Sequence, residues 1–332
     1  MIEEESSTKI VTWIFKNIKF IIIPGFKLKD LSSRESEYQK MTGKRKRNFR
    51  VKSKLTIIGI IIIFIVVSFA IFSSWLSPYT FEQAMSSSYS SSEWFAEPSA
   101  EHPLGQTYRG RDVLARIIFG AQSTLLISFC SVAISLIIGV FLGLIAGYYG
   151  GWVDTILMRI MDIILSFPGI VLAITIIALT RNPYIYISIT QSIINLILVF
   201  TLIGIPHFAR LIRATTLQVR HLPYINAARV VGSNKIRLMF RHILPNCIHP
   251  IIISFTHRIG GVIISLSILS FLGFSDARLI EWGNDISAAS MNMISAPWAL
   301  LYPCLMILIT VLGFMLLGDG LRESIDPLLK NL

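Results

Sequence analysis

The chain has 332 residues, a formal net charge of +11, 53% hydrophobic residues and only 15% charged residues. Soluble domains average ~45–50% apolar and ~25% charged residues, so this composition argues against a soluble enzyme, a disordered chain and a disulfide scaffold. Long apolar runs beside bunched basic residues favour a membrane surface over a nucleic acid as the partner of the positive charge. The three cysteines show neither CxxC nor Cys/His spacing, so we expect core residues rather than a metal site.

Residues 1–54 are predicted to form a cytoplasmic N-terminal extension. The chain starts with acidic residues and lacks the basic start of a signal peptide. Apolar residues recur at helical spacing from Ile10 to Ile22, with Lys16 and Lys19 on another face, which predicts an amphipathic helix in the membrane interface. A seventh span is the alternative, but it would place both lysines in the bilayer at ~2.5–3.5 kcal/mol each. The remainder of the extension is predicted to be a solvated basic linker.

Six apolar runs are long enough for a helix to cross a bilayer core of ~30 Å. Because lipid cannot satisfy unpaired backbone groups, we expect an all-α polytopic membrane protein with six transmembrane helices. The predicted spans are Leu55–Leu76, Leu125–Tyr148, Ile160–Leu179, Ile185–Ile205, Ile248–Phe274 and Trp298–Leu317. The predicted domains are the first helix at 55–76, an external loop at 77–118, a transmembrane domain at 119–320 with five helices, and a cytoplasmic tail at 321–332.

The basic residues predict the orientation of these spans. Lysines and arginines are concentrated in residues 40–54, before the first span, and in residues 210–241, between the fourth and fifth spans. Residues 77–116 are instead net acidic. By the positive-inside rule, both termini and the loop between the fourth and fifth spans are cytoplasmic.

The sequence offers no catalytic constellation. It contains no P-loop, no HExxH and no GxSxG motif, and no paired metal-ligand spacing. We therefore expect no catalytic residues, no metal site and no cofactor in this chain.

Three glycines form a regular stripe in the second predicted span. Gly139, Gly143 and Gly147 repeat every four residues and therefore share one helix face. Such a groove lets a neighbouring backbone approach closely. Tight packing is the simpler interpretation, and a helix that slides against its neighbour is the functional one.

The loop at about 207–245 is the most informative stretch. Pro223 can open a short helix, and Gly232 can end it in a left-handed conformation. Ser233 can then cap a second helix. Ala227 and Ala228 give the first helix a small-residue face that fits a groove on another protein. A solvated basic loop that only sets topology is the alternative.

Several motifs resemble the permease subunits of ATP-binding-cassette (ABC) importers, and specifically the "C"-type permeases of the dipeptide/oligopeptide family. Asn226-Ala227-Ala228 followed by Gly232 and Ile243-Leu244-Pro245 resembles the family's cytoplasmic "EAA" motif. The other matching stretches are His102–Gly105, Gly110–Leu114, Gly147–Asp154, Phe167-Pro168, Ala209–Arg213, Ser270–Gly273, Ser295–Trp298 and Leu317–Arg322. They occur in the family's order and spacing from about residue 102 to residue 327.

The resemblance implies that the loop carries a coupling helix that docks on a separate ATPase subunit. The residues implied in coupling are Tyr224, Asn226, Ala227, Ala228 and Gly232, and Ile243, Leu244 and Pro245 would brace them against the membrane. Asn226 stands where the family usually has glutamate, so an acidic contact is not expected there. The implied partners are a second homologous permease, two cytoplasmic ATPases, an extracytoplasmic peptide-binding protein and membrane lipid, with no nucleic acid. ATP and Mg²⁺ would bind to the ATPases.

His257 and Arg258 are charged or titratable residues inside the fifth predicted span. A charge at that depth costs ~2.5–3.5 kcal/mol and usually faces a bundle interior or a water-filled cavity. The functional interpretation is a wall of the translocation path that meets peptide carbonyls or carboxylates. The alternative is that the pair snorkels to an interface or bonds a neighbouring helix.

Other polar residues are predicted to be structural. Arg159 and Asp162 are three apart, which favours an ion pair within one helix. Asp154 and Asp319 fall in family motifs and are interpreted as structural. Arg111-Asp112 is expected to anchor the outer segment that precedes the second span.

The combined hypothesis is a non-enzymatic permease subunit of an ATP-driven importer of dipeptides or oligopeptides. A nickel or metal-chelate importer of the same family is the nearest alternative. An ion-coupled secondary transporter would show repeated halves and more charges at depth, and an intramembrane enzyme would need a paired nucleophile and base. Neither pattern is evident in the sequence.

Overall fold

A computed structural model describes residues 54–86, 94–180 and 188–325 of the chain. The predicted amphipathic helix and nearly all of the basic linker lie outside these residues, as does the start of the fourth predicted span. Within the described ranges the secondary structure is helical, apart from one isolated β-bridge between Gln106 and Asp112. The all-α prediction is therefore confirmed.

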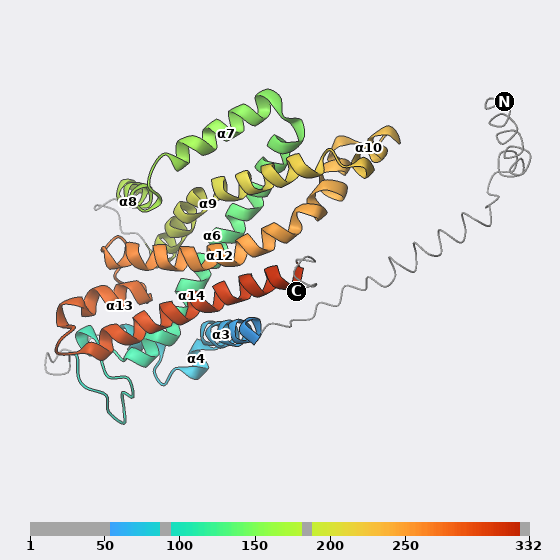
Figure 1. The fold of residues 1–332 in the computed structure, drawn as a ribbon. Helices are drawn as coiled ribbons and strands as arrows, with labels where there is room; N and C mark the ends of the chain where they lie inside the picture. Colours follow the sequence, from blue (N-terminus) through green and yellow to red (C-terminus); the bar gives the residue numbers. More distant parts are fainter. Residues whose placement is uncertain (1–53, 87–93, 181–187, 326–332) are drawn as a thin grey trace, which may run out of the picture. The chain divides into compact units, whose positions relative to one another are not determined.

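Five helices are long and apolar enough to cross a membrane (Figure 1). They are α3 (Lys54–Ile71), α6 (Val113–Tyr149), α9 (Ile189–Val219), α12 (Leu244–Phe271) with the turns that precede it, and α14 (Pro297–Ile325). The shorter elements are α4 (Ser73–Leu76), α5 (Phe81–Met85), α7 (Gly151–Leu165), α8 (Gly169–Thr180), α10 (Pro223–Val230), α11 (Lys235–Arg237), a π-helical segment (Leu238–Ile243) and α13 (Trp282–Ala289).

The third predicted span, Ile160–Leu179, is wrong as a single helix. The structure has two helices here, α7 and α8, whose axes are bent by 83°. The break falls at Ser166–Pro168, where proline lacks an N–H group and disfavours helical geometry in the preceding Phe167. A span at this place is therefore a broken one, with α7 starting directly after the end of α6.

The fourth predicted span ends too early. It was placed at about Ile185–Ile205 on its apolar run, but α9 continues through Pro206 to Val219. The residues beyond the proline are buried against α6, notably Phe208, Ala209 and Ile212. This packing offsets the lost backbone hydrogen bond. The loop between the fourth and fifth spans is accordingly shorter than the predicted 207–245.

The second predicted span begins too late. Helix α6 starts at Val113 rather than Leu125, and Asp112 caps it by accepting a 2.7 Å hydrogen bond from the amide of Ala115. Arg111 donates to the carbonyl of Ser86. The expected anchoring role of this dipeptide is thus visible as a helix cap and a loop contact.

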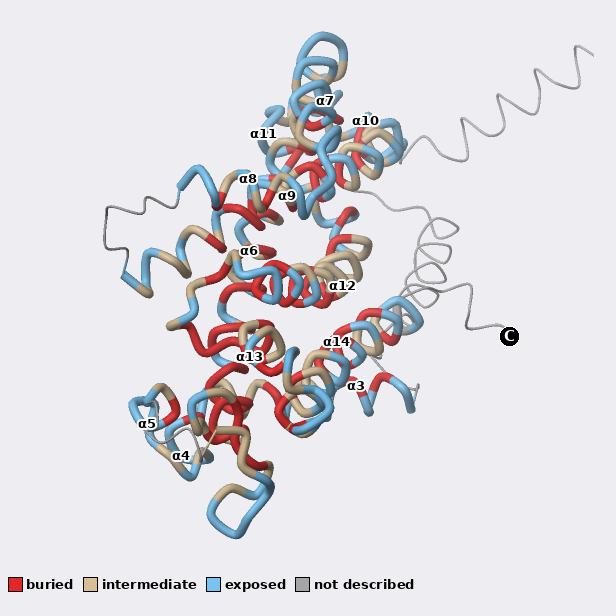
Figure 2. Tube along the Cα trace, turned by 90° about the vertical axis from the view of Figure 1, so that its left-hand side faces the viewer, coloured by how far each residue is buried: buried red, intermediate tan, exposed pale blue. Residues whose placement is uncertain are grey.

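The core forms along α6, α9 and α12. Phe208, Ile263, Leu266 and Trp282 are among the fully buried side chains that meet there. Figure 2 shows buried residues concentrated on α12 and α13, whereas α7 is mostly exposed. The core therefore lies between α6, α9, α12 and α13, and α7 lies at the surface.

Candidate functional site: a coupling elbow and a cavity lined by Arg258

The coupling elbow, residues 220–243, joins α9 to α12 at one end of the bundle (Figure 1). Pro223 occupies the first turn of α10, where its missing N–H is not needed. Ile225 is fully buried and fixes α10 to the bundle. It belongs to a hydrophobic cluster that also holds Leu144, Ile212 and Ile243.

The outward side of α10 carries the residues implied in coupling. Tyr224, Asn226 and Ala227 are exposed and Ala228 is half-buried. Val230 and Val231 are each 87% exposed. Two neighbouring valines in full contact with solvent cost hydrophobic free energy, so the chain presents an apolar tip without covering it.

Gly232 ends α10 in the expected left-handed conformation, with a φ of +87°. Its amide donates to the carbonyl of Arg229, and the amide of Ser233 donates to the carbonyl of Ala228. These two bonds form a Schellman motif, which needs a positive φ at this residue. Nothing lies within 4 Å of an added β-carbon, so conformation rather than space requires glycine here.

The predicted cap of the second short helix is wrong by one residue. Asn234, not Ser233, caps α11, and its side chain accepts a hydrogen bond from the amide of Ile236. Ser233 is instead used by the Schellman motif, which takes its backbone amide. Of the bracing residues, Ile243 is fully buried, Leu244 is half-buried and Pro245 is exposed.

The elbow is tied to α6 by Arg220, which directly follows α9. Its guanidinium donates a 2.7 Å hydrogen bond to the carbonyl of Gly147 in the last turn of α6. A cation at the carboxyl end of a helix also interacts favourably with the helix dipole. Nearby, Lys235 of α11 lies over the ring of Tyr149. A displacement of the elbow would therefore be transmitted directly to α6 through these contacts.

Two ion pairs connect α7 to the same part of α9. Arg213 holds both carboxylate oxygens of Asp154, one of them at 2.6 Å, and Arg210 holds Asp162 at 2.5 Å. The predicted ion pair of Asp162 with Arg159 is wrong, because α9 runs farther than expected and supplies Arg210 instead. Bidentate arginine–carboxylate pairs also fix orientation, so they hold α7 against α9.

The three glycines of α6 lie against α9. A β-carbon at Gly139 would be 2.6 Å from the β-carbon of Phe208, and one at Gly143 would be 2.4 Å from the carbonyl oxygen of Ala209. At Gly147 the obstacle would be Thr216 at 2.6 Å. The stripe therefore packs two helices backbone to backbone, and the hypothesis that it lets them slide stays a prediction.

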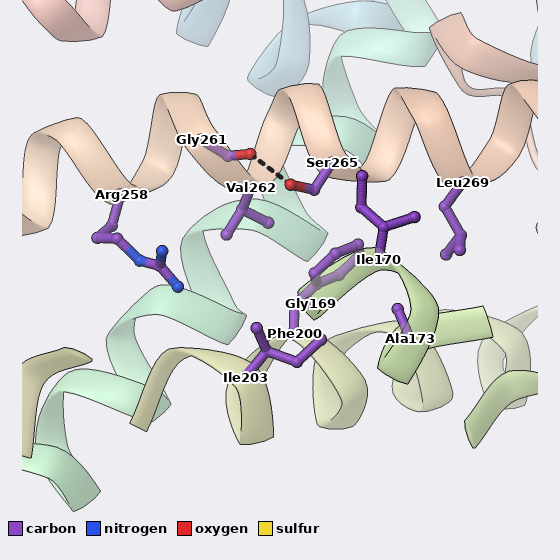
Figure 3. A pocket seen from close by; sticks show the side chains of 10 residues that line it. All are labelled: Gly169, Ile170, Ala173, Phe200, Ile203, Arg258, Gly261, Val262, Ser265 and Leu269. Atoms are coloured by element: carbon purple, nitrogen blue, oxygen red, sulfur yellow. Dashed lines mark hydrogen bonds between the residues drawn. The ribbon is translucent and has the colours of Figure 1, made fainter. Parts of the chain in front are cut away.

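His257 and Arg258 do not act as a pair. The Nδ1 of His257 donates to the carbonyl of Ile253 on its own helix, and its Nε2 faces α14, where it lies 3.2 Å from Asp319. Adjacent helical residues point about 100° apart, so Arg258 faces a different neighbour from His257. There it lines a cavity of about 310 Å³ between α8, α9 and α12 (Figure 3). Of the two residues, Arg258 lines this cavity, and a role of either residue in the translocation path stays a prediction.

The sequence interpretation missed a three-residue motif at the other end of α12. Glu281 caps α13 through its side chain, Trp282 donates to the carbonyl of Ile117 in α6, and Gly283 touches the backbone of α12. A β-carbon at Gly283 would lie 2.5 Å from the carbonyl oxygen of Ser267. A glutamate, tryptophan and glycine in succession between two apolar runs could have drawn attention to this site.

A buried ion pair supports the same helix. Arg116 of α6 lies 2.5 Å from Asp285 of α13, and both side chains are at least 95% buried. Arg116 also donates to the carbonyl of Ala84 in α5. Glu281 is fully buried next to this pair; burial raises its pKa to about 7, with a further contribution from the charge of Asp285. We call Arg116, Glu281, Trp282, Gly283 and Asp285 the α13 anchor.

Comparison with known proteins identifies the family. Residues 139–331 match the family described as binding-protein-dependent transport system inner membrane component, and residues 47–97 match the N-terminal transmembrane domain of oligopeptide transport permease C. The chain belongs to this permease family. The resemblance in the sequence motifs is confirmed, and the permease is a multi-pass membrane component of a transport system.

The relatives agree with this assignment. The permease is 40% identical over 281 residues to the dipeptide transport system permease protein DppC of Alkalihalophilus pseudofirmus, covering 84% of this chain and 88% of that protein. It is 42% identical over 235 residues to the glutathione transport system permease protein GsiD of Pectobacterium atrosepticum, covering 70% and 75%. The GsiD protein of Escherichia coli is 38% identical over 286 residues, covering 86% and 90%.

Among solved structures, the permease is similar to the one described as "Crystal structure of an amino acid ABC transporter with histidines". The two share 16% sequence identity, with a TM-score of 0.43. The match covers 60% of this chain and 89% of the other.

Proposed function

We propose that this permease is one of two membrane subunits of an ATP-driven importer of dipeptides or oligopeptides. The observation that supports a peptide as the substrate is the set of relatives, whose names specify a dipeptide and the tripeptide glutathione. The match of residues 47–97 to an oligopeptide permease domain supports the same substrate class. A nickel or metal-chelate cargo, known in this family, is the alternative.

The partners we propose are a second homologous permease, two cytoplasmic ATPases and an extracytoplasmic peptide-binding protein. The exposed tip of the coupling elbow supports the ATPase contact, since Val230 and Val231 present an apolar surface that a partner groove would bury. ATP and Mg²⁺ bind to the ATPases in this scheme, because the permease sequence has no P-loop. The subunit itself is a non-catalytic component.

The proposed orientation places the coupling elbow and both termini in the cytoplasm. The concentration of lysines and arginines in residues 40–54 and 210–241 supports it. The α13 anchor then lies toward the outer side, because α12 separates it from the elbow along the chain.

The mechanism we propose is alternating access driven through the elbow. Closure of the ATPases on ATP displaces α10, and the displacement reaches α6 through Arg220 and α9 through the three-residue turn at 220–222. Helix α7 follows α9 through its two ion pairs. A substrate shifts such an equilibrium only by binding the two states with different affinity.

Reconstitution tests the proposed function. The complete transporter in liposomes, with its binding protein outside and ATP inside, should accumulate a radiolabelled dipeptide and should stop when the ATPases lack ATP. Uptake of nickel in place of peptide would favour the alternative cargo. Uptake by the permease alone on an ion gradient would contradict the ABC mechanism.

A pair of variants tests the coupling elbow. Gly232→Val forces a β-branched residue into a left-handed conformation, at a cost of about 1–3 kcal/mol, and should reduce ATPase co-purification and uptake. Gly232→Asn is the matched control, because asparagine tolerates this conformation, and it should keep both. Equal behaviour of the two variants would contradict the coupling role of this turn.

A further inference from the structure

Arg258 lies near the midpoint of α12 (Leu244–Phe271) and forms no ion pair with any residue that the structure describes. At ~1.5 Å per residue both helix ends are about 20 Å away, farther than an arginine side chain extends, so it does not snorkel to an interface. Its buried Nε has no hydrogen-bond partner among the described residues. A charge at such depth costs ~2.5–3.5 kcal/mol and therefore points to a functional partner.

Two carboxylates on helices packed against α12 have other partners. Asp319 of α14 lies 3.2 Å from His257, and Asp285 of α13 pairs with Arg116. Within residues 54–86, 94–180 and 188–323, no acidic side chain forms an ion pair with Arg258. A partner anion must therefore come from outside the described part of the chain.

The cavity beside Arg258 has the volume and surface of a small-molecule site. Its volume of about 310 Å³ lies at the lower end of the range of ~300–1,000 Å³ for such pockets. The wall is apolar, and its larger members are Ile170, Phe200, Ile203, Val262 and Leu269 (Figure 3). Arg258 is the charged residue that lines this cavity.

The polar atoms of the cavity do not satisfy the guanidinium. The hydroxyl of Ser265 donates a 2.9 Å hydrogen bond to the carbonyl of Gly261 on its own helix (Figure 3). One turn from Arg258, the hydroxyl of Ser254 bonds the imidazole of His207 at 3.0 Å. Among the residues that the structure describes, the guanidinium of Arg258 therefore points into the cavity without a bonded acceptor.

A guanidinium beside an apolar wall is suited to one chemical class of ligand. It binds a carboxylate through two parallel charge-assisted hydrogen bonds, while the apolar wall takes an aliphatic or aromatic side chain. We propose that Arg258 binds the free C-terminal carboxylate of the peptide during translocation, with the adjacent side chain of the peptide in the cavity. This inference rests on the proposed function and adds a residue and a group of the substrate to it.

The test compares one peptide in two forms. The reconstituted transporter is given a dipeptide with a free carboxylate and the same dipeptide as its C-terminal amide, chosen so that the wild type moves both measurably. The binding protein is the same in every assay, so its own preference cancels when a variant is compared with the wild type. We expect Arg258→Gln to lower uptake of the free acid by about tenfold or more, because hydrogen bonds to charged groups contribute ~1.5–3 kcal/mol. Uptake of the amide should stay within about twofold of the wild type. Arg258→Lys should fall between the two.

The outcomes separate this inference from the proposed function. If the wild type moves neither peptide, the proposed function fails. If the wild type moves the acid and Arg258→Gln keeps the wild-type ratio of acid to amide, only the carboxylate site is overturned. An equal loss for both peptides also overturns it, since that is the result of a structural role.

A second variant keeps the test valid if Arg258→Gln fails to assemble. Gly261 lines the cavity, and nothing lies within 4 Å of an added β-carbon there. Gly261→Leu should therefore fill the cavity while co-purification with the ATPases is retained, and uptake of the free acid should fall by about tenfold. Wild-type uptake by this variant would overturn the cavity as a peptide site.

Discussion

The α13 anchor and the coupling elbow lie at opposite ends of α12 and are built in opposite ways (Figure 1). In the anchor, Trp282 is fully buried and Gly283 is pressed against the backbone of α12. In the elbow, Val231 is 87% exposed and Gly232 has open space around it. One end of α12 is therefore packed against other parts of the chain, whereas the residues beyond its other end are exposed.

This difference indicates where the chain completes its own fold and where it needs another protein. A buried ion pair and a glycine in backbone contact allow no displacement without loss of packing. An exposed apolar tip on a short helix contributes little to the fold and remains available for docking. We therefore expect substitutions in the anchor to act on the level of folded permease, and substitutions in the elbow tip to act on assembly.

The largest effect is expected at the buried ion pair. Asp285→Asn leaves the guanidinium of Arg116 buried without a counter-charge, which costs about 3–5 kcal/mol. The amount of folded permease in the membrane should drop steeply in a fluorescence size-exclusion assay. Asp162→Asn is the matched control, because Asp162 and its partner Arg210 are both about half exposed, and it should cost about 1 kcal/mol or less. Similar losses for both variants would remove the contrast between anchor and surface.

A smaller effect is expected at the helix contact. Gly283→Ala places a methyl group 2.5 Å from the carbonyl oxygen of Ser267, so α13 must move away from α12 at a cost of about 1–3 kcal/mol. Gly261→Ala, in open space on α12, should be neutral or slightly stabilising. Thermal unfolding of the purified transporter measures both, and a Gly283→Ala protein as stable as wild type would contradict close packing in the anchor.

The anchor also predicts a dependence of stability on pH. Burial raises the pKa of Glu281 to about 7, above its usual value near 4.5, so the folded state binds the proton more tightly than the unfolded state. The contribution of this bound proton to the free energy of unfolding is fully present below pH about 4.5 and is lost as the pH rises to about 7. The melting temperature of the wild type should fall over this interval, and Glu281→Gln should flatten the slope. An identical slope in both proteins would show that another group titrates.

The smallest effect on stability is expected at the elbow tip. Val231→Asp changes a side chain that is 87% exposed, so the free energy of unfolding should stay within about 0.5 kcal/mol of that of the wild type. Co-purification of the ATPases should nevertheless fall, because a charge is placed in the proposed contact. Met291→Asp, 97% exposed and near the anchor, is the control that should leave co-purification unchanged. ATPase binding by Val231→Asp at wild-type level would count against docking at this tip.

Much of the architecture was readable from local patterns. Long apolar runs gave the spanning helices because the bilayer forces backbone hydrogen bonds to close within each segment. Pro223 and Gly232 marked the ends of α10 because their effects are local, one through a missing donor and the other through a positive φ. Local patterns did not place the helix ends at Pro206 and Pro168, since one proline stays inside a helix and the other breaks it.

The failures share a physical cause. Whether a helix passes a proline depends on what packs beyond it, and at Pro206 that is the glycine groove of α6, distant in sequence. The choice of Arg210 over Arg159 as partner of Asp162 likewise depends on the length of α9. The sequence by itself determined the membrane class, the family and the composition of the coupling elbow, because each is encoded in contiguous residues. Only the tertiary structure decided that His257 and Arg258 face different helices and that, of the two, Arg258 lines a cavity, because those facts depend on which helices lie on either side of α12.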